Sequence, residues 1–503
     1  MFLSPQLELL ERPLPLRMGI GAAHDAVSTS SPQAQAFYDQ GLAYLHSYEW
    51  IEAARSFNQA LRLDPKLALA HVGLSYAHTE LNVPAAAHSA LERAVALNEH
   101  DRQHIAIRKA QMAAEDAPRD AAKLASYRKA LDNALAQFPL DEELWLQRGV
   151  AESSDPADRG QGSPAGSARY YERALALAPS HFAAHHFLAH AFENSGRIDD
   201  ALKHASAYAA MAPAIPHARH MNGHELRRLG QIDHAVAEFE AADRLETEYL
   251  KNEKIPFEHE WHYQHNLDLL GTSYQYLGQM AKAERLLKAS FEIPSALAVQ
   301  EFNKREWPVF LLSRGRTKEA LEAAKVMIAH PSSLIRAAGH IEAGHAMLAS
   351  SRFREAADEA NAALKEMKSA SDGAALVATS FEAVQGEFFL RTGQRGKGRT
   401  MLDQVIRKLR SAPGPDEWTQ ASFALEAIAR AAREAGDWEY AARAANQMME
   451  HDPAYAGTHY ALALAAEHAG DGSTARAEFA LAEKYWNKAD PDLAELRDIR
   501  GRR

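Results

Sequence analysis

Small and apolar residues recur along the chain in a pattern that predicts pairs of antiparallel helices. The clearest pair lies within residues 37–65, where apolar side chains at helical spacing occur on both sides of a polar break before Trp50. Gly41 in the first helix and Ala53 in the second are small enough for the two helices to approach closely. Pro65 ends the second helix, because proline cannot continue one. This segment therefore predicts a helical hairpin.

The same spacing is repeated to the end of the chain. In most repeats a turn residue, usually glycine, is followed five positions later by an alanine. The turn residues are Gly196, Gly230, Gly278, Gly315, Ser351, Gly436 and Gly470. Residues 67–97, 102–139 and 145–179 supply three less regular pairs. We expect about ten to eleven hairpins stacked into a right-handed α-solenoid, an all-α fold without a β-sheet.

This spacing resembles the tetratricopeptide repeat (TPR), whose unit of about 34 residues is two antiparallel helices. The resemblance implies a small residue at position 8 of each unit, a turn residue at 15, alanine at 20 and proline at 32. It also implies that the first helix of each hairpin lines an inner groove, chiefly through positions 2, 5, 9 and 12.

The repeats divide the chain into three parts. Residues 1–31 form an extended N-terminal leader, residues 32–290 an N-terminal array and residues 291–503 a C-terminal array. Two interruptions are expected within the arrays. Residues 153–167, rich in Ser, Gly, Pro and Asp, form a loop inserted in one hairpin, and residues 246–258 lengthen another connection.

Composition narrows the function classes. The net charge of −11 is spread along the chain without a basic stripe, so nucleic acid is not expected as a partner. With no cysteine, disulfides and thiolate metal sites are excluded. No run of about 18 apolar residues exists to span a membrane, and the N-terminus lacks the pattern of a secretion signal. We expect a soluble, cytoplasmic protein; its oligomeric state is left open.

Histidines are concentrated in one part of the chain. Of the 25 histidines, 12 lie between residues 181 and 265. The repeat register puts several at the groove positions of three consecutive hairpins, together with two carboxylates. These residues are His186, His190 and Glu193, then His217, His220 and His224, then His265 and Asp268. Their spacings place the side chains of each helix on one face.

Imidazole is a common ligand of zinc, iron and copper in proteins. We therefore predict a divalent transition metal in the groove, with ligands His190, His220, His224 and His265. His186, His217 and Asp268 are candidates to support these ligands or to hold a second ion. Glu193 and Asp268 can accept a hydrogen bond from the second ring nitrogen of a ligating histidine, or act as a general base. Arg227 is a candidate for an anionic substrate or a simple helix-end charge. His181, His185 and His262 lie off the groove positions and are predicted to pack.

Within the tetratricopeptide superfamily the chain is similar to a His-rich group of bacterial proteins of unassigned activity. The similarity covers roughly the first 290 residues and is carried by four segments. They are residues 24–42, His181 with His186 and His190, residues 217–224, and His265-Asn266. Asp268 stands where the group often has histidine, and His71 where it often has tryptophan. The resemblance implies a shared site but no particular reaction, and whether His24 in the leader joins that site is open.

Three functions are open from these patterns. The first is a metal-dependent enzyme, hydrolytic or oxidative, acting on a small-molecule or peptide ligand in the groove. The alternative is a protein-interaction scaffold that binds a partner peptide there, and metal sensing or storage without turnover is a third reading. The sequence does not name the metal, the number of ions, the reaction or the substrate.

Overall fold

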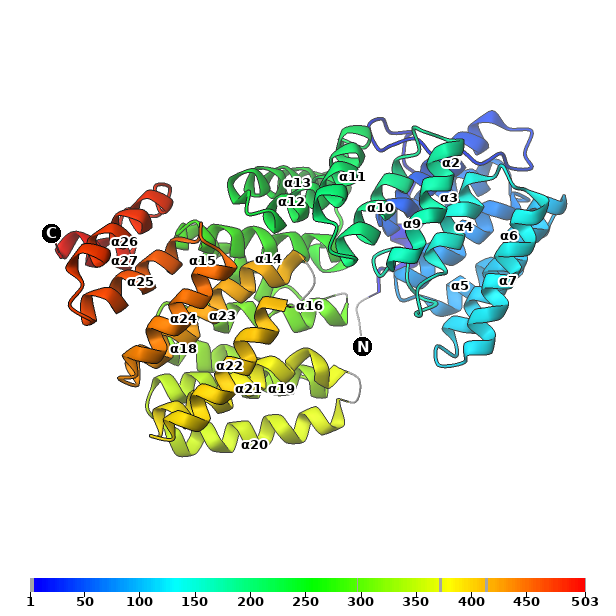
Figure 1. Ribbon diagram of the computed structural model, residues 1–503. Coiled ribbons are helices and arrows are strands. Elements are labelled where there is room, and N and C mark those ends of the chain that lie inside the picture. Colours follow the sequence, from blue (N-terminus) through cyan, green and yellow to red (C-terminus); the bar gives the residue numbers. More distant parts are fainter. Residues whose placement is uncertain (1–3, 296, 371–372, 412–414, 503) are drawn as a thin grey trace. The chain divides into compact units, whose positions relative to one another are not determined.

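The structure is a computed structural model that describes residues 4–295, 297–370, 373–411 and 415–502 (Figure 1). Throughout these ranges the regular elements are helices, and no strand occurs in them. The chain divides into two compact units. Unit 1 comprises Met1–Leu229 and Ala237–His259, and unit 2 comprises Gly230–Val236 and Glu260–Arg503. The predicted all-α fold of stacked helical hairpins is confirmed.

Unit 1 begins with the leader and holds the first helices. They are α1 (Leu7–Leu10), α2 (Pro32–His46), α3 (Trp50–Leu63), α4 (Ala68–Glu80), α5 (Pro84–Arg93), α6 (Glu99–Glu115), α7 (Ala121–Gln137), α8 (Glu142–Val150), η1 (Ala165–Ser167), α9 (Ala168–Leu177), α10 (Phe182–Asn194), α11 (Ile198–Met211) and α12 (Pro216–Arg228). Helix α13 (Ile232–Glu253) starts in unit 2 and continues in unit 1, which also holds η2 (Phe257–His259).

Unit 2 holds the remaining helices. They are α14 (Trp261–Tyr276), α15 (Met280–Glu292), α16 (Ala298–Asn303), α17 (Glu306–Ser313), α18 (Thr317–Ile328), α19 (Ser333–Ala349), α20 (Phe353–Ser369), α21 (Ala374–Arg391), α22 (Arg395–Ser411), α23 (Pro415–Glu434), α24 (Trp438–His451), α25 (Ala456–His468), α26 (Gly472–Tyr485) and α27 (Ala494–Gly501).

Twelve pairs of consecutive helices occur in the described ranges. In unit 1 they run from α2/α3 to α12/α13, and in unit 2 from α14/α15 to α25/α26, with α16 and α27 outside the pairs. The sequence predicted ten to eleven. The pair α21/α22 was not detected, because it lacks the alanine that follows the turn glycine by five positions in other units. Gly393 makes the turn at φ 87°, and Gly398 stands where other units have alanine.

Close packing explains the small residue at position 8. A Cβ atom added to Gly41 would lie 2.6 Å from the ring of Phe57, which is fully buried on the second helix of the same hairpin. The same relation joins Gly223 to Phe239, again at 2.6 Å. A large side chain on the second helix therefore requires glycine opposite it, sixteen residues earlier in the chain.

The leader lies against the first hairpin. Arg55 on α3 donates to the carbonyl oxygens of Arg12 and Pro13, and Gln40 on α2 donates to that of Pro15. Apart from the four-residue α1, this part of the leader has no regular element, as its prolines predict.

The two expected interruptions differ in outcome. Residues 153–167 form a loop between α8 and α9 that ends in the short η1, as predicted. The prediction for residues 246–258 is wrong, because α13 continues to Glu253. Its last turns find partners in the first hairpin: Tyr249 donates to Glu52 at 2.9 Å, and Glu253 pairs with Arg55 at 2.9 Å.

Within the described ranges, none of the helices combines the length and apolar character that crossing a bilayer requires.

Two glycines of α22 test the packing explanation. A Cβ atom on Gly398 would lie 2.7 Å from the backbone nitrogen of Leu390, whereas one on Gly396 meets nothing within 4 Å. We expect Gly398→Ala to lower the free energy of unfolding by about 1–3 kcal/mol through overpacking. Gly396→Ala should leave it unchanged or raise it by up to about 1 kcal/mol, since alanine favours the helix. Urea unfolding of both variants measures the difference, and equal effects would contradict the explanation.

Candidate metal centre

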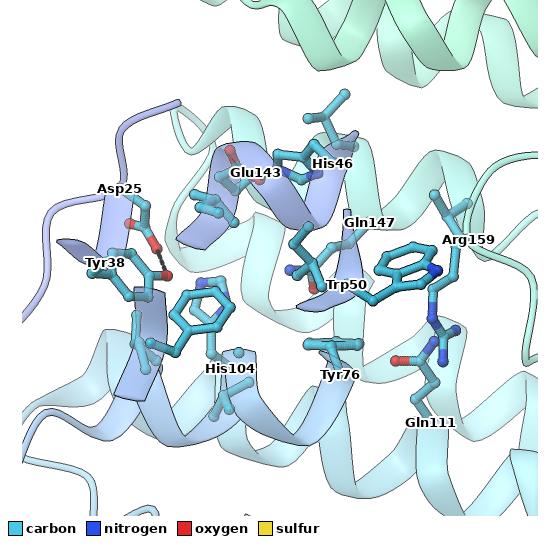
Figure 2. A pocket seen from close by; sticks show the side chains of 18 of the residues that line it. Asp25, Tyr38, His46, Trp50, Tyr76, His104, Gln111, Glu143, Gln147 and Arg159 are labelled. Carbon is cyan, nitrogen blue, oxygen red and sulfur yellow. Dashed lines mark hydrogen bonds and ion pairs between the residues drawn. The ribbon is translucent and has the colours of Figure 1, made fainter. Parts of the chain in front are cut away.

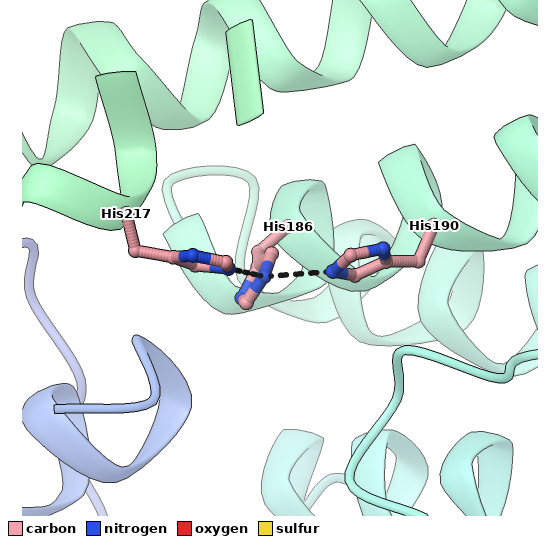
Figure 3. Close-up of side chains that lie close together, drawn as sticks. All are labelled: His186, His190 and His217. Atoms are coloured by element: carbon pink, nitrogen blue, oxygen red, sulfur yellow. Dashed lines mark hydrogen bonds between the residues drawn. The ribbon is translucent and has the colours of Figure 1, made fainter. Parts of the chain in front are cut away.

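Three histidines from two neighbouring hairpins meet in the interior of unit 1. His186 and His190 lie one helical turn apart on α10, and His217 follows Pro216 at the start of α12. Figure 3 shows the three rings in a row, with His186 between the other two. The repeat register predicted these positions to face one groove, and the structure brings the three residues together.

Each of the outer rings directs a nitrogen at the same atom of the central ring. The Nε2 atom of His186 lies 3.0 Å from Nε2 of His217 and 3.2 Å from Nε2 of His190. The three residues are almost wholly buried, with exposed fractions of 0, 7 and 2% for His186, His190 and His217. Bulk water is therefore excluded from the point where the nitrogens converge.

The backbone fixes the protonation of the central ring. Nδ1 of His186 lies 2.7 Å from the carbonyl oxygen of His46. A carbonyl can only accept, so Nδ1 carries the proton and Nε2 presents a lone pair. Burial lowers the pKa of His186 well below its usual value, and neighbouring His190 lowers it further. His186 is neutral at pH 7, as a metal ligand must be.

Two of the three distances between the nitrogens match those of ligands around one small cation, and one ligand atom of each residue lies within 4.8 Å of those of the other two. Nitrogens bound to a tetrahedral zinc ion at about 2.0–2.1 Å are about 3.3 Å apart. Hydrogen bonding alone explains the arrangement less well, because the single lone pair of His186 Nε2 accepts one N–H donor while two nitrogens approach it. The arrangement can therefore hold a cation between three imidazoles.

The turn of the first hairpin covers these histidines. The ring of Tyr48 lies 4.7 Å from that of His186 and 5.1 Å from that of His217, centroid to centroid. Its hydroxyl donates to the carbonyl oxygen of Arg159 in the inserted loop at 3.0 Å. Arg159 in turn forms ion pairs of 2.7 Å with Glu80 and Glu115. Loop and turn thus close the site together.

A buried carboxylate supports the same turn. Glu143 on α8 accepts from His46 at 2.8 Å and from His181 at 3.1 Å. Burial opposes ionisation of Glu143, but the two histidines outweigh it and lower the pKa to about 2. The ionised Glu143 holds His46, and the carbonyl of His46 orients His186. The prediction that His181 packs away from the ligands agrees with its place here.

Two buried glutamates near this site differ in charge at neutral pH, because Glu193 is ionised and Glu225 is protonated. Glu193 lies 3.7 Å from Nδ1 of His190 and 3.7 Å from Nδ1 of His224. Burial opposes its ionisation, but His190 and His224 hold the pKa of Glu193 below its usual value. Burial raises the pKa of Glu225 well above its usual value, and the charge of Glu193 adds to this. One negative charge therefore stands next to the imidazoles at neutral pH.

The other predicted site residues lie on α12 and α14. His220 and His224 are buried, with ring centroids 4.4 Å apart and the ring of Phe239 beside them. Arg227 is also buried on α12, away from solvent. His265 and Asp268 belong to α14 of unit 2, where the His265 ring stacks on Trp261 at 6.5 Å. The assignment of His265 and Asp268 to the same site as His220 and His224 stays a prediction.

Sequence reasoning missed the residues that cover and orient the histidines. His46 and Glu143 come from α2 and α8, and no local spacing pairs them. Tyr48 did carry a signal. It occupies the turn position where most units have glycine, and its φ of 61° is unusual for a bulky residue. An aromatic residue at that position indicates a function for its ring.

The comparisons with known proteins agree with the helical hairpins. The family described as tetratricopeptide repeat matches residues 156–216, which include α9, α10 and α11. The match identifies a tetratricopeptide repeat in this segment of the chain. No curated protein matches it in sequence.

Solved structures with similar folds include a tetratricopeptide repeat protein from Parabacteroides merdae. It is 14% identical and has a TM-score of 0.38, over 56% of this chain and 99% of its own. Yeast Tom70 is 13% identical with a TM-score of 0.34, over 93% of this chain and 94% of its own. Similarity at this level transfers no function to the present chain.

Replacing Tyr48 by glycine tests its role as a cover. Loss of a buried aromatic ring costs about 3–5 kcal/mol, and relief of the left-handed backbone recovers about 1–2 kcal/mol. We therefore expect Tyr48→Gly to lower the free energy of unfolding by roughly 1–4 kcal/mol. Modification of His186, His190 and His217 by diethyl pyrocarbonate should become faster, as measured by peptide mass spectrometry.

Asn82→Gly is the matched control, because Asn82 holds the corresponding turn of the next hairpin at φ 57° and is exposed. It should change stability by less than about 1 kcal/mol. Unchanged histidine modification in Tyr48→Gly would show that Tyr48 does not cover the site.

Proposed function

We propose that this tetratricopeptide-repeat protein binds one divalent transition metal ion through the Nε2 atoms of His186, His190 and His217. The observation that carries the proposal is that the buried Nε2 atoms of His190 and His217 both approach the lone pair on Nε2 of His186. Of the ligands predicted from sequence, this set keeps His190. It also uses His186 and His217, which the sequence offered as supporting residues or as ligands of a second ion.

The surroundings of the three rings support the proposal. Metal-bound histidines generally have their second ring nitrogen held by a backbone carbonyl or a carboxylate. The carbonyl of His46 does this for His186, and Glu193 lies on the corresponding side of His190. A set of neutral imidazoles suits zinc, iron or copper.

A more specific version of this proposal is that the bound metal ion catalyses a reaction. Three protein ligands leave a fourth position, at which metal-dependent hydrolases activate water and oxygenases bind dioxygen. Because the rings are almost wholly buried, a larger substrate would reach the ion only after a rearrangement of the residues that cover it. In this form Glu193 places a negative charge beside His190, and the protein is a cytoplasmic enzyme with a small substrate.

Removal of one ligand tests the metal site. After reconstitution with Zn²⁺ or Co²⁺, we expect wild-type protein to bind a metal ion at this site. His217→Ala should lower the affinity of that ion by at least about 100-fold, since it removes a ligand directly. Equilibrium dialysis with elemental analysis measures the bound metal, and the Co²⁺ absorption spectrum reports its nitrogen ligands.

His185→Ala is the matched control. His185 is next to His186 on α10, but its Nδ1 atom faces His204 at 2.8 Å instead of the three-histidine cluster. This variant should keep the metal. Wild-type protein that binds less than about a tenth of an equivalent after reconstitution would exclude the proposed site.

A second candidate function, peptide binding, is favoured by a cavity in unit 2. It has a volume of about 650 Å³ and is lined by side chains of α17, α19, α21 and α23, the first helices of four successive hairpins. Charged residues of both signs line it, including Glu342, Arg391 and Arg430. Ligand pockets commonly have volumes of about 300–1,000 Å³. TPR proteins of this shape can receive an extended peptide in such a groove.

Filling the cavity tests this second function. We expect peptides selected from a random-sequence display library to bind the full chain, and Ala427→Trp to weaken them by at least about 10-fold. The reason is steric, because Ala427 lines the cavity. Ala480→Trp, at an exposed position of α26, should have no effect. Fluorescence anisotropy measures the affinities, and equal loss in both variants would argue against groove binding.

A further inference from the structure

A second cluster of ligand-type side chains lies elsewhere in unit 1. Asp25 comes from the leader, and His100 and His104 lie one turn apart on α6. One nitrogen or oxygen atom of each lies within 4.8 Å of those of the other two. None of these residues belongs to the three-histidine centre.

A second carboxylate joins this cluster from the N-terminus of α8. The Oδ2 atom of Asp141 lies 2.8 Å from Nε2 of His100 and 3.7 Å from Nε2 of His104. Oδ1 of Asp25 lies 3.6 Å from the same nitrogen of His100. Two carboxylate oxygens and two imidazole nitrogens therefore gather around one small volume.

In each carboxylate, the oxygen that does not face the histidines accepts a hydrogen bond from another residue. The hydroxyl of Tyr38 donates to Oδ2 of Asp25 at 3.1 Å, and the backbone N–H of Leu144 donates to Oδ1 of Asp141 at 3.0 Å. Each aspartate thus has one oxygen occupied by a hydrogen bond and the other directed at the histidines. Outer hydrogen bonds of this kind orient carboxylates that bind metals.

The hydrogen bonds of this cluster do not satisfy every polar atom in it, and the exception is a ring nitrogen of His104. His104 is only 5% exposed, and its Nε2 atom has no hydrogen bond to any of the described residues. Asp141, at 3.7 Å, lies beyond hydrogen-bond distance. A buried ring nitrogen that has only an ion-pair contact with Asp141 at 3.7 Å is poorly satisfied, and a bound cation would satisfy it better.

The cluster borders an internal cavity of about 80 Å³ (Figure 2). Asp25 and His104 form part of its wall, together with Tyr38, Trp50 and Tyr76. One water needs about 10–15 Å³ by this measure, so the cavity has room for several. Water in this space can complete the coordination of an ion held by the four side chains.

We propose that Asp25, His100, His104 and Asp141 form a second metal site, for a divalent cation of the Mn²⁺ or Fe²⁺ class. Two carboxylates make this ligand set harder than three imidazoles, and harder ligands favour these ions. The ion ties the leader to α6 and α8. His24, whose place in the sequence prediction was open, points elsewhere: it is exposed and bonds to Asp39 at 2.8 Å.

The test starts from the full chain with the first centre removed by His186→Ala and His217→Ala. We expect this double variant to bind Mn²⁺ in equilibrium dialysis with elemental analysis. Adding Asp25→Asn or His104→Gln should lower the Mn²⁺ affinity by at least about 10-fold. His24→Ala, next to Asp25 but outside the cluster, should leave the affinity unchanged.

Two outcomes overturn the second site. One is a double variant with a native circular dichroism spectrum that binds no Mn²⁺, and the other is equal loss in His24→Ala and His104→Gln. The two proposals fail separately. Suppose that Asp25→Asn lowers Mn²⁺ binding, whereas His217→Ala leaves Zn²⁺ binding at its wild-type level. This result would support the second site and exclude the three-histidine site.

A second measurement needs no substitution at the cluster. Wild-type protein loaded with Fe²⁺ is treated with ascorbate and hydrogen peroxide, and oxidised histidines are mapped by mass spectrometry. A bound iron ion should oxidise His100 and His104 despite their burial, and spare exposed His88. Oxidation of His88 with protection of His100 and His104 would overturn the proposal.

Discussion

The lone pair on Nε2 of His186 is the constraint around which the interior of unit 1 is arranged. The carbonyl oxygen of His46 accepts a hydrogen bond from Nδ1–H of this ring, so the proton stays on Nδ1. Burial keeps the ring neutral. His190 and His217 then bring two further nitrogens within 3.2 Å of a single acceptor. Without a cation, only one of these two nitrogens can donate a hydrogen bond to the lone pair of His186, and the other is left unsatisfied. The alternative is a cation at the centre. The second case satisfies all three rings at once, because each contributes one lone pair.

The cover over this centre is made from hairpins that are distant in sequence. Glu143 on α8 fixes His46 on α2, and the turn that follows His46 places Tyr48 over the rings. The left-handed conformation of Tyr48 costs about 1–2 kcal/mol, which is less than a buried aromatic ring contributes. A glycine turn would be cheaper but would leave the histidines open to solvent. The strained turn is therefore consistent with a protective role.

The sequence predicted those parts of the structure that repeat. Fixed spacing revealed the hairpins, and the register placed His186, His190 and His217 on one side because groove positions recur in every unit. The contacts of His46, Tyr48 and Glu143 were not predictable in this way, since they join different hairpins and break the repeat. Residues 246–253 were misjudged for a related reason: α13 is longer than its counterparts, and the partners of its last turns, Glu52 and Arg55, lie in the first hairpin.

Charge balance explains why the two proposed centres differ in their surroundings. Three neutral imidazoles offset none of the charge of a divalent ion, so a buried ion among them requires an anion close by. Glu193, ionised at 3.7 Å from His190, meets this need without being a ligand. In the second cluster Asp25 and Asp141 bring two carboxylates to the ion itself, and no additional anion is needed. The softer centre thus depends on a neighbouring carboxylate to offset part of the ion's charge, whereas the harder one contains its own counter-charges.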